Sequence, residues 1–488
     1  MNVLVVTSEA APFAKTGGLG DVLGALPRYL RKLGHDVRVF LPFYSSIDTK
    51  KGTFSPVGDP FPIVLGPHRY VVRIVTVDTH PGTFFVHCPE LYARGSLYTN
   101  DLDEHRRFLV LGWAALIAAQ HMRFAPDVLH CNDWQCGLLP LTLKVAFGWD
   151  RLFANTKTLL SIHNLNYQGV FPASTIGDTN LASSAHLFHQ DQLHHPHGGR
   201  INYMLHGLLY AGIVSTVSPT YAREIQSEEH GAGLDPFLRA RRSTVVGILN
   251  GVDYDEWSPE KDTLIPHRYS AADLSGKALD KEALVTALGL PYVPGVPVLG
   301  IVSRMASQKG FDLLGPILGN LLVKWGFQLA VLGSGESRLE QMFEGFRRRF
   351  PKQVGFYRGF SNPLAHLIEA GSDIFLMPSR YEPCGLNQMY SLRYGTVPIV
   401  HRTGGLADTV RPWNPYAAND AMDPRRAGNG FVFDHHDSRG LEWAIEMALG
   451  TFKHRPSWDR LVQNGMAEDF SWERQAALYV DLYQRIPG

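Results

Sequence analysis

Two short runs, near opposite ends of the chain, combine a cation with paired glycines. Residues 15–22 read KTGGLGDV, and residues 402–410 read RTGGLADTV. Glycine lets the backbone approach a ligand closely, and a helix start offers unpaired N–H groups, so each run suits an anion such as a phosphate. Lys15, Gly17 and Gly18 are the candidates in the first run. The alternative is a plain strand-to-helix turn with Lys15 in solvent, but two copies favour two nucleotide-fold halves facing each other across a cleft.

A second pair of cations, Arg304 and Lys309, follows the apolar residues 298–303 in the run SRMASQKG. Arginine can grip phosphate oxygens through two bonds, whereas lysine acts as a point charge. Two cations after a strand and before a helix can clamp a diphosphate. They could instead be ordinary surface charges. The loop GSG at residues 333–335 follows the next strand and favours the clamp.

A lone carboxylate, Glu382, lies in the run SRYEPCGLNQ at residues 379–388, after the apolar residues 374–377. A carboxylate can accept hydrogen bonds from sugar hydroxyls, and the backbone N–H groups of Gly385 and Leu386 can face phosphate. The alternative is an ion pair between Glu382 and Arg380. Cys384 is expected to fill buried space, because no histidine lies nearby in sequence to activate it.

Histidines close two further strand-like runs, at His130 and His163, with Asp133 nearby in the run HCNDW. A lone histidine is more often a satisfied core residue, but two at neighbouring strand ends fit a polar pocket. Asp133 could orient an imidazole or accept a sugar hydroxyl. No spacing of His and Asp demands a metal, and the histidine-rich residues 186–197 are best interpreted as a solvated loop.

Alternation of strands and helices is expected to position these residues. Strands are predicted at residues 3–7, 36–40, 71–77, 83–87, 127–130, 158–162 and 214–217, and in the second half at 298–303, 328–332, 355–357, 374–377 and 397–400. Helices are predicted at 21–33, where Pro27 could cause a kink and Gly34 ends the helix, and at 109–120. This order indicates an α/β protein with two doubly wound parallel sheets and ligands at the carboxyl ends of the strands.

The predicted domains are residues 1–253 and 254–471, because the NGVD run at 250–253 resembles a turn. A last helix over 472–486 should pack back on the first domain. Its apolar face is expected to comprise Ala476, Leu478, Tyr479, Leu482 and Tyr483.

Composition excludes several functional classes. A chain of 488 residues is too long to fold around a single hydrophobic core. Its residues are 45% hydrophobic and 19% charged, as in a globular enzyme. The 46 basic residues equal the 46 acidic ones, which argues against nucleic acid or anionic membrane as a partner. Four cysteines without a CxxC pair suggest reduced thiols and a cytoplasmic location. We see neither a signal peptide nor a run that could span a bilayer.

The ordered set of motifs resembles the bacterial glycogen synthases and plant starch synthases. The resemblance rests on KTGGLGDV, HCNDW, SIHNLNYQG at 161–169, VSPTYA at 217–222, NGVD, SRMASQKG and the long run 379–410. It implies a GT-B fold with two Rossmann-like domains. It also implies transfer of glucose from ADP-glucose or UDP-glucose to the non-reducing end of an α-1,4-glucan such as glycogen, with retention, and with no metal or other cofactor.

The resemblance also implies roles for individual residues. Lys15, Arg304 and Lys309 would contact the donor diphosphate, and Glu382 would bind the glucose hydroxyls. The backbone amides of Leu386 and Asn387 would face phosphate. The glucose and acceptor positions would be lined by His163, Asp133, Asp21 and Asn250.

One stretch departs from the family pattern. The family carries Leu-Lys and small residues shortly before VSPTYA, whereas this chain reads MLHG at 204–207 and has no lysine there. Other hypotheses also remain open. These are a related transferase with a smaller acceptor, a phosphorylase that would need a pyridoxal cofactor, and a glucan-binding protein without activity.

Overall fold

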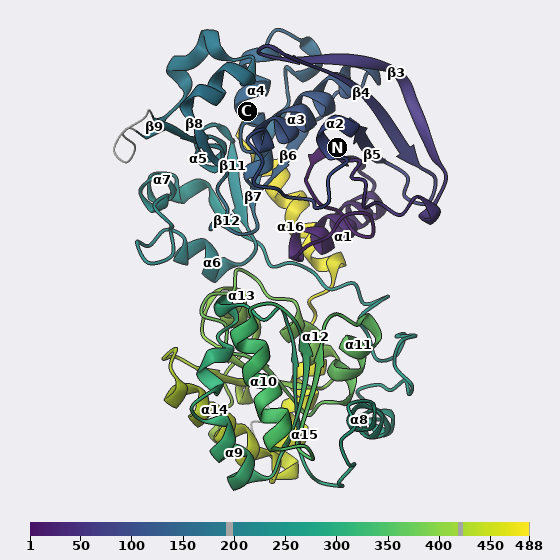
Figure 1. Cartoon of the computed structure of the whole chain (residues 1–488), viewed down its shortest axis with the longest axis vertical. Helices are drawn as coiled ribbons and strands as arrows, with labels where there is room; N and C mark the ends of the chain where they lie inside the picture. The colour runs from purple at the N-terminus through teal and green to yellow at the C-terminus, as the bar shows by residue number, and fades with distance from the viewer. Residues whose placement is uncertain (192–198, 418–422, 488) are drawn as a thin grey trace. The chain divides into compact units, whose positions relative to one another are not determined.

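The computed structural model describes residues 1–191, 199–417 and 423–487 (Figure 1). The chain divides into two compact units. The N-terminal unit comprises Met1–Gly251 together with the segment from Trp472 onward, and the C-terminal unit comprises Val252–Ser471. This division falls two residues before the predicted boundary.

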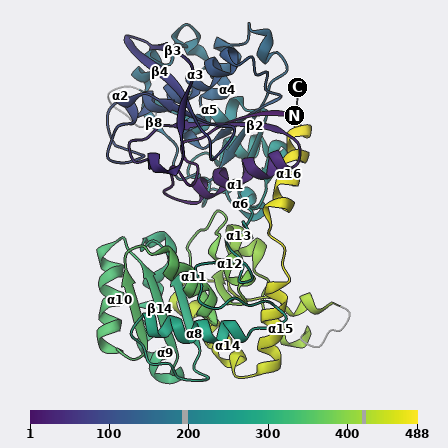
Figure 2. The ribbon, with the colours of Figure 1, turned by 90° about the vertical axis from the view of Figure 1, so that its right-hand side faces the viewer.

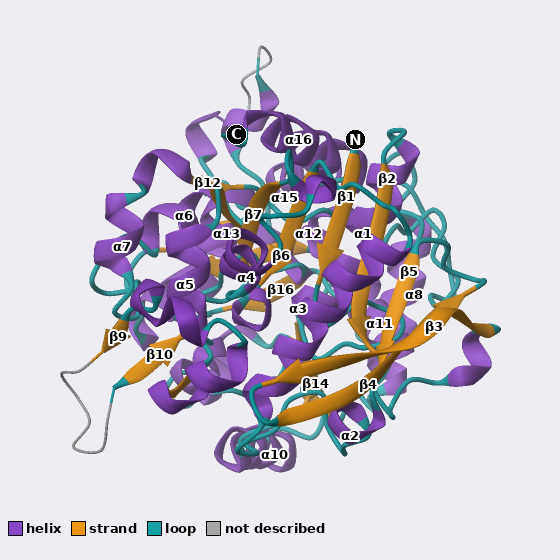
Figure 3. Ribbon diagram, turned by 90° about the horizontal axis from the view of Figure 1, so that it is seen from above, coloured by secondary structure: helices purple, strands orange, loops and turns teal. Residues whose placement is uncertain are grey.

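The N-terminal unit is built on a nine-stranded sheet in the order β12-β11-β7-β6-β1-β2-β5-β4-β3. The pairings from β12 to β5 are parallel, and β4 and β3 are antiparallel additions at one edge. In Figure 3, β1, β2, β6 and β7 run side by side. The strands are β1 (Asn2–Val6), β2 (Asp36–Pro42), β3 (Phe54–Leu65), β4 (His68–Val77), β5 (Thr83–His87), β6 (Val128–Asn132), β7 (Lys157–Ile162), β11 (Ile213–Thr216) and β12 (Val245–Gly247).

Helices and a small antiparallel sheet complete this unit. Helix α1 runs unbroken through Pro27, and Gly34 ends it with φ of 86°. His35 N then donates to Leu30 O at 3.2 Å, as in a glycine-terminated helix. The helices are α1 (Gly18–Lys32), α2 (Pro89–Tyr92), α3 (Glu104–His121), α4 (Leu139–Ala146), α5 (Tyr203–Tyr210), α6 (Pro219–Glu224) and α7 (Asp235–Ala240), and the small sheet comprises β8 (Val170–Pro172), β10 (Arg200–Asn202) and β9 (Gln190–Asp191).

The C-terminal unit has six parallel strands in the order β15-β14-β13-β16-β17-β18. Numbered within the unit, this order is 3-2-1-4-5-6, that of a dinucleotide-binding Rossmann sheet. The strands are β13 (Val298–Val302), β14 (Gln328–Gly333), β15 (Val354–Arg358), β16 (Ile374–Met377), β17 (Val397–His401) and β18 (Phe431–Phe433), and the helices are α8 (Ser275–Ala287), α9 (Leu318–Trp325), α10 (Ser337–Arg349), α11 (Asn362–Gly371), α12 (Asn387–Arg393), α13 (Gly404–Thr409), α14 (Ser438–Phe452) and α15 (Arg455–Met466).

Both faces of this second sheet are covered. Successive strand residues point to opposite faces, so Ile374 packs in the core with α9, α10, α14 and α15, while Phe375 packs in the core with α8 and α11. This explains why its strands are continuous apolar runs. The predicted doubly wound parallel sheet is confirmed here.

The last helix, α16 (Trp472–Arg485), belongs to the N-terminal unit and lies beside α1 (Figure 2). Its buried face includes Ala476, Tyr479, Leu482 and Tyr483, but the prediction for Leu478 is wrong, because 42% of that residue is exposed. No helix in the described ranges is long and apolar enough to cross a bilayer.

Candidate active site

The order of strands places the C-terminal candidates at one position. In the Rossmann order, ligands bind at the carboxyl ends of the strands, where the chain reverses its direction of progress across the sheet. That position lies between β13 and β16, which pair with each other. Arg304 and Lys309 follow β13, and Glu382 follows β16. The sheet therefore brings the two predicted groups to the same switch point.

Lys309 and Glu382 form an ion pair, with 2.7 Å between Nζ and Oε2. Ser379 Oγ donates to the same carboxylate oxygen at 2.9 Å, so both bonds engage Oε2 and leave Oε1 for another donor. Glu382 is 6% exposed. The alternative pairing of Glu382 with Arg380 is wrong, since the ion-pair partner of Glu382 is Lys309. The pair thus joins the two loops and presents a cation beside an oriented carboxylate.

A second carboxylate, Glu336, shapes the loop that carries Arg304 and Lys309. It accepts bonds from Ser307 N at 2.6 Å and from Ser307 Oγ at 2.6 Å. Met305 N donates to Ser334 O at 2.8 Å, which ties this loop to the GSG loop after β14. The Arg304 side chain is exposed, and no ion-pair partner for it occurs among the residues that the structure describes. It therefore offers a cation on a braced loop.

The backbone after Glu382 leads directly into α12. Gly385 has φ of 72°, a conformation that favours glycine, and Leu386 is the N-cap of α12. The first N–H groups of a helix have no acceptor within the helix, so those of Leu386 and Asn387 suit phosphate oxygens. Asn387 Nδ2 donates to Val302 O at 2.9 Å, which fixes the start of α12 against β13.

The second glycine run packs against the loop that carries Glu382. Gly404 has φ of 43°, and a Cβ there would lie 1.9 Å from Glu382 O. A Cβ on Gly405 would lie 2.1 Å from Cys384 O, and Gly405 N donates to Glu382 O at 3.2 Å. These glycines let the run pack under the Glu382 loop. The second run thus supports the loop that carries Glu382, and its use as an anion site stays a prediction.

In the N-terminal unit, the first glycine run lies between β1 and α1. Gly17 is the N-cap of α1, and neither Gly17 nor Gly18 has any atom near the position of a Cβ, so their backbone is open to a ligand. Lys15 Nζ lies 2.6 Å from Asp21 Oδ1. Burial raises the pKa of Asp21, and Lys15 offsets part of this.

Sequence reasoning missed Glu9, which organises this run. Glu9 is 3% exposed and accepts bonds from Thr16 N, Thr16 Oγ1 and Tyr98 OH, each at 2.6 Å. Gly17 N also donates to Glu9 Oε2, at 3.4 Å. The available signal was a carboxylate shortly after an apolar strand, the same signal that singled out Glu382. Glu9 and Glu336 thus play matching parts: each holds the backbone of a loop that carries a candidate cation.

Asp133 follows β6, the neighbour of β1, with φ of 54°, a strained value for a residue with a side chain. Its Oδ1 accepts a bond from His163 N at 2.7 Å. Burial raises the pKa of Asp133 to about 7 despite the backbone bonds, which lower it. The carboxyl group is therefore poised between its two protonation states near neutral pH.

His163 follows β7, and burial lowers its pKa to about 3, so the ring is neutral. Asn132 Nδ2 donates to Val6 O at 3.1 Å, which turns Asn132 Oδ1 toward His163 Nε2 at 3.0 Å. His163 Nε2 must then carry the proton, and Nδ1 is a buried acceptor without a partner in the described structure. An unpaired acceptor of this kind suits a sugar hydroxyl.

His130 is a core residue, so its predicted place in a polar pocket is wrong. Its ring nitrogens contact Tyr483 OH at 2.9 Å and Ser161 Oγ at 2.6 Å, and it is 1% exposed. Asn250, in contrast, has a buried Oδ1 without a partner among the described residues. Asn250 is thus available to a ligand, whereas His130 anchors α16.

The departure from the family pattern lies in α5. Leu205 and His206 are both buried there. His206 Nε2 accepts from His189 N at 3.0 Å, so Nδ1 carries the proton and donates to Asn202 O at 2.7 Å. His206 therefore holds the start of the histidine-rich stretch, of which residues 192–198 lie outside the described ranges.

Cys384, beside Glu382 in the loop after β16, is a free, buried cysteine, as predicted. Phe360, which sequence reasoning missed, follows β15 and is 82% exposed; the signal was an aromatic residue just past a strand's carboxyl end. No three His, Cys, Asp or Glu side chains are grouped to hold a metal ion in residues 1–191, 199–417 and 423–487.

Comparison with known proteins gives a consistent result along the whole chain. Residues 2–240 match the starch synthase catalytic domain model, and residues 292–463 match the model of glycosyl transferases group 1. The glycogen synthase of Myxococcus xanthus is 45% identical over 99% of both chains, and that of Koribacter versatilis is 41% identical over 99% of this chain and 98% of its own. The chain belongs to the glycogen and starch synthase family.

Solved structures of relatives support this family assignment. The catalytic domain of starch synthase IV from Arabidopsis thaliana, bound to ADP and acarbose, is similar with a TM-score of 0.87, 33% identity and 99% coverage of both chains. A sucrose-phosphate synthase from Thermosynechococcus elongatus has a TM-score of 0.59 at 18% identity, which reflects the shared fold. The two-domain α/β fold expected from the sequence is therefore confirmed as that of the glycogen and starch synthases.

Proposed function

We propose that this chain transfers glucose from a nucleoside-diphosphate glucose to the non-reducing end of an α-1,4-glucan, with retention of configuration. ADP-glucose is the proposed donor and glycogen the proposed acceptor. The observation that carries this proposal is the Lys309–Glu382 pair of 2.7 Å at the switch point of a Rossmann sheet. Family membership and the starch synthase relative with bound ADP and acarbose support it.

The chemistry of glucosyl transfer matches these groups. As the bond between glucose and phosphate breaks, positive charge develops on the sugar ring and negative charge on the leaving diphosphate. Preorganised cations that face developing negative charge lower the barrier. We assign Arg304, Lys309 and the amides of Leu386 and Asn387 to the diphosphate, and Glu382 to the glucose hydroxyls. Glu382 supports the ring without forming a covalent intermediate.

The N-terminal residues complete the proposal. Lys15, Gly17 and Gly18 are assigned to the donor. His163, through its unpaired Nδ1, and Asn250, through its unpaired Oδ1, are assigned to sugar hydroxyls. Asp21 and Asp133 are assigned to the glucose and the acceptor. Exposed Phe360 offers a flat apolar surface on which the base of the donor can stack.

The test is an assay of nucleoside diphosphate release with ADP-glucose or UDP-glucose, with and without a glycogen primer. We expect primer-dependent release, and a fall in kcat of about a hundredfold in Glu382→Gln. Glu282→Gln, at an exposed glutamate of α8, is the matched control. Absence of primer-dependent release with both donors would refute the proposal. EDTA should leave the rate unchanged, because the cations replace a metal, and cell fractionation tests the proposed cytoplasmic location.

Competing acceptors separate this proposal from a transferase that acts on a sugar phosphate. A glucan should be preferred over a sugar phosphate when both are supplied. A glucan-binding protein without activity would bind glycogen equally well in wild type and Glu382→Gln and would release no nucleotide from either.

A further inference from the structure

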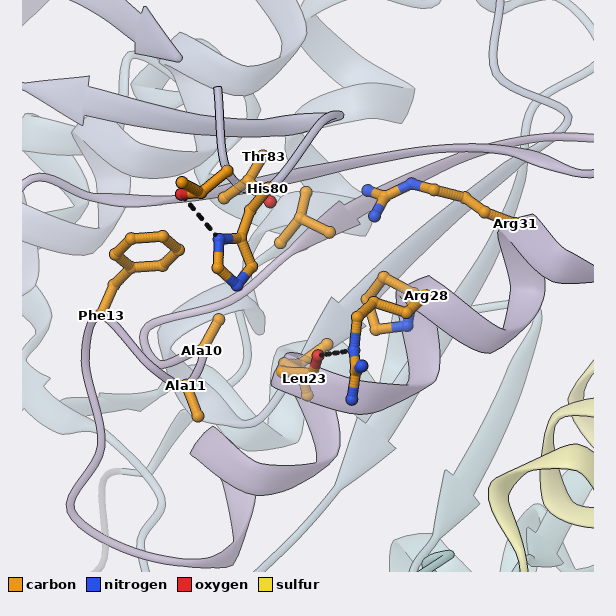
Figure 4. Close-up of a pocket in the computed structure, with 12 residues that line it drawn as sticks. Ala10, Ala11, Phe13, Leu23, Arg28, Arg31, His80 and Thr83 are labelled. Carbon is orange, nitrogen blue, oxygen red and sulfur yellow. Dashed lines mark hydrogen bonds between the residues drawn. The ribbon is translucent and has the colours of Figure 1, made fainter. Parts of the chain in front are cut away.

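A pocket of about 220 Å3 lies in the N-terminal unit, and no candidate site residue lines it. It is formed by α1, by the segment after β1, and by β2 and the start of β5 (Figure 4). Figure 4 shows Phe13 and His80 on one side of it and the side chains of Arg28 and Arg31, from α1, on the other. The proposed glucosyl transfer does not use this pocket.

The charge around this pocket is positive. The positive charge comes from Arg28 and Arg31, which line it together with His80, and none of its twelve lining residues is Asp or Glu. Burial lowers the pKa of His80, and the charges of Arg28, Arg31 and Lys51 lower it further. The charge of Asp36 raises the pKa of Arg31, but burial lowers it by more. An anion would therefore meet a favourable potential here.

Both arginines are held in place by backbone carbonyls. Arg31 donates from Nε to Val37 O at 3.0 Å, and from Nη2 to Val37 O at 2.7 Å and to Gly82 O at 3.1 Å. Arg28 Nε donates to Gly24 O at 3.1 Å. Guanidinium groups fixed in this way lose little further freedom when they bind an anion.

The remaining lining limits the size and character of the ligand. Phe13, Leu23, Pro27 and Val39 provide an apolar wall, and the Phe13 ring meets His80 edge to face at 4.8 Å. The volume lies below the roughly 300 Å3 at which pockets for drug-sized ligands begin. The pocket therefore suits one phosphate group that carries a compact organic part, and not a whole nucleotide.

We propose that this pocket binds a small phosphate monoester, with its phosphate against Arg28 and Arg31 and its organic part against Phe13 and Leu23. Guanidinium groups favour phosphate because their planar N–H donors match its oxygens. Bound there, the ligand would contact Ala10 and Ala11, and Ala11 N donates to Gly20 O in the first turn of α1 at 2.8 Å. The site is thus linked to the helix that begins at the first glycine run.

Isothermal titration calorimetry on the full chain tests this proposal with three probes: inorganic phosphate, glucose 1-phosphate and glucose. We expect binding of both phosphates, with glucose 1-phosphate tighter, and no binding of glucose. Arg28→Gln should weaken binding of glucose 1-phosphate at this site about tenfold or more, since a bond to a charged group is lost. The matched control is Arg73→Gln, at an exposed arginine of β4 outside the pocket.

A second pair of variants reverses the charge without removing an arginine. Thr79→Glu places a carboxylate in the pocket lining and should abolish binding there, whereas Thr49→Glu, at an exposed threonine outside the pocket, should not. Circular dichroism confirms that each variant is folded. Equal affinities in Arg28→Gln and Arg73→Gln, or no binding of either phosphate, would overturn the proposal. Because the readout is binding and not turnover, failure here is separate from failure of the transferase assay.

Discussion

Glu9 provides the most direct test of how the first glycine run is held. Its Oε2 accepts from backbone N–H groups, whereas its Oε1 accepts from the hydroxyl groups of Thr16 and Tyr98. In Glu9→Gln the amide oxygen can replace Oε2, and the amide NH2 can face the hydroxyl groups, which can rotate. The geometry can therefore survive while the charge is lost.

The expected loss follows from these three bonds of 2.6 Å. Bonds to a charged group contribute about 1.5–3 kcal/mol and neutral ones about 0.5–1.5 kcal/mol. Loss of the charge then costs about 1 kcal/mol for each bond, so an upper bound is about 3 kcal/mol. If two thirds of this bears on the order of the loop, kcat/KM falls about 30-fold. Tyr98→Phe, which removes one bond, should have a smaller effect, and Glu9→Ala a larger one.

The assay is kcat/KM for ADP-glucose with saturating glycogen, beside the Tm of each variant. Glu90→Gln, at an exposed glutamate of the same unit, is the control. We expect activity to fall in the order Tyr98→Phe, Glu9→Gln, Glu9→Ala. If Glu9→Gln lowers the Tm but leaves kcat/KM at the wild-type value, Glu9 supports the fold alone and the reasoning about the loop is wrong.

Two other predictions concern Asp133 and Gly404. Burial raises the pKa of Asp133 to about 7 from 3.8, so the unfolded chain releases its proton near pH 4 while the folded chain keeps it to about pH 7. The free energy of unfolding should therefore fall as pH rises through this window, and Asp133→Asn should remove roughly 3–4 kcal/mol of that dependence. The free energy of unfolding is measured in urea at pH 4.5 and pH 7.5, and an equal change between the two pH values in wild type and in Asp133→Asn would contradict this. Gly404→Ala combines a positive φ with a Cβ 1.9 Å from Glu382 O, so we expect a loss of about 3 kcal/mol and reduced kcat. Gly289→Ala, with φ of 72° and open space around its Cβ, should cost only about 1–2 kcal/mol; equal Tm shifts in the two variants would show that the close approach has no effect.

The central strands could be predicted from the sequence because strands buried on both faces are short apolar runs. The strand β16 was predicted to its last residue for this reason. The strand β3 was missed, because Pro56, Gly58, Pro60 and Pro62 interrupt it. Proline is tolerated there since β3 lies at the edge of the sheet, where a missing N–H breaks no ladder. The short strand β18 was also missed, because three residues carry no detectable periodicity.

The candidate site was predictable where a side chain follows a strand. Glu382, Lys309 and Asp133 were found in this way. The function of Gly404 and Gly405 was not, because a glycine needed for close packing of two backbone segments has the same sequence signal as one that approaches a ligand. His130 was misjudged for a similar reason: its partner Tyr483 lies 353 positions away, so no local pattern reveals the bond.

The bond between His130 and Tyr483 has a consequence for biosynthesis. The N-terminal unit is discontinuous, and Tyr479 and Tyr483 of α16 complete the surroundings of a histidine in β6. On the ribosome, the first 251 residues lack these contacts to His130 until α16 has been translated. A premature stop codon within α16, before Tyr483, would therefore damage the domain that was made first.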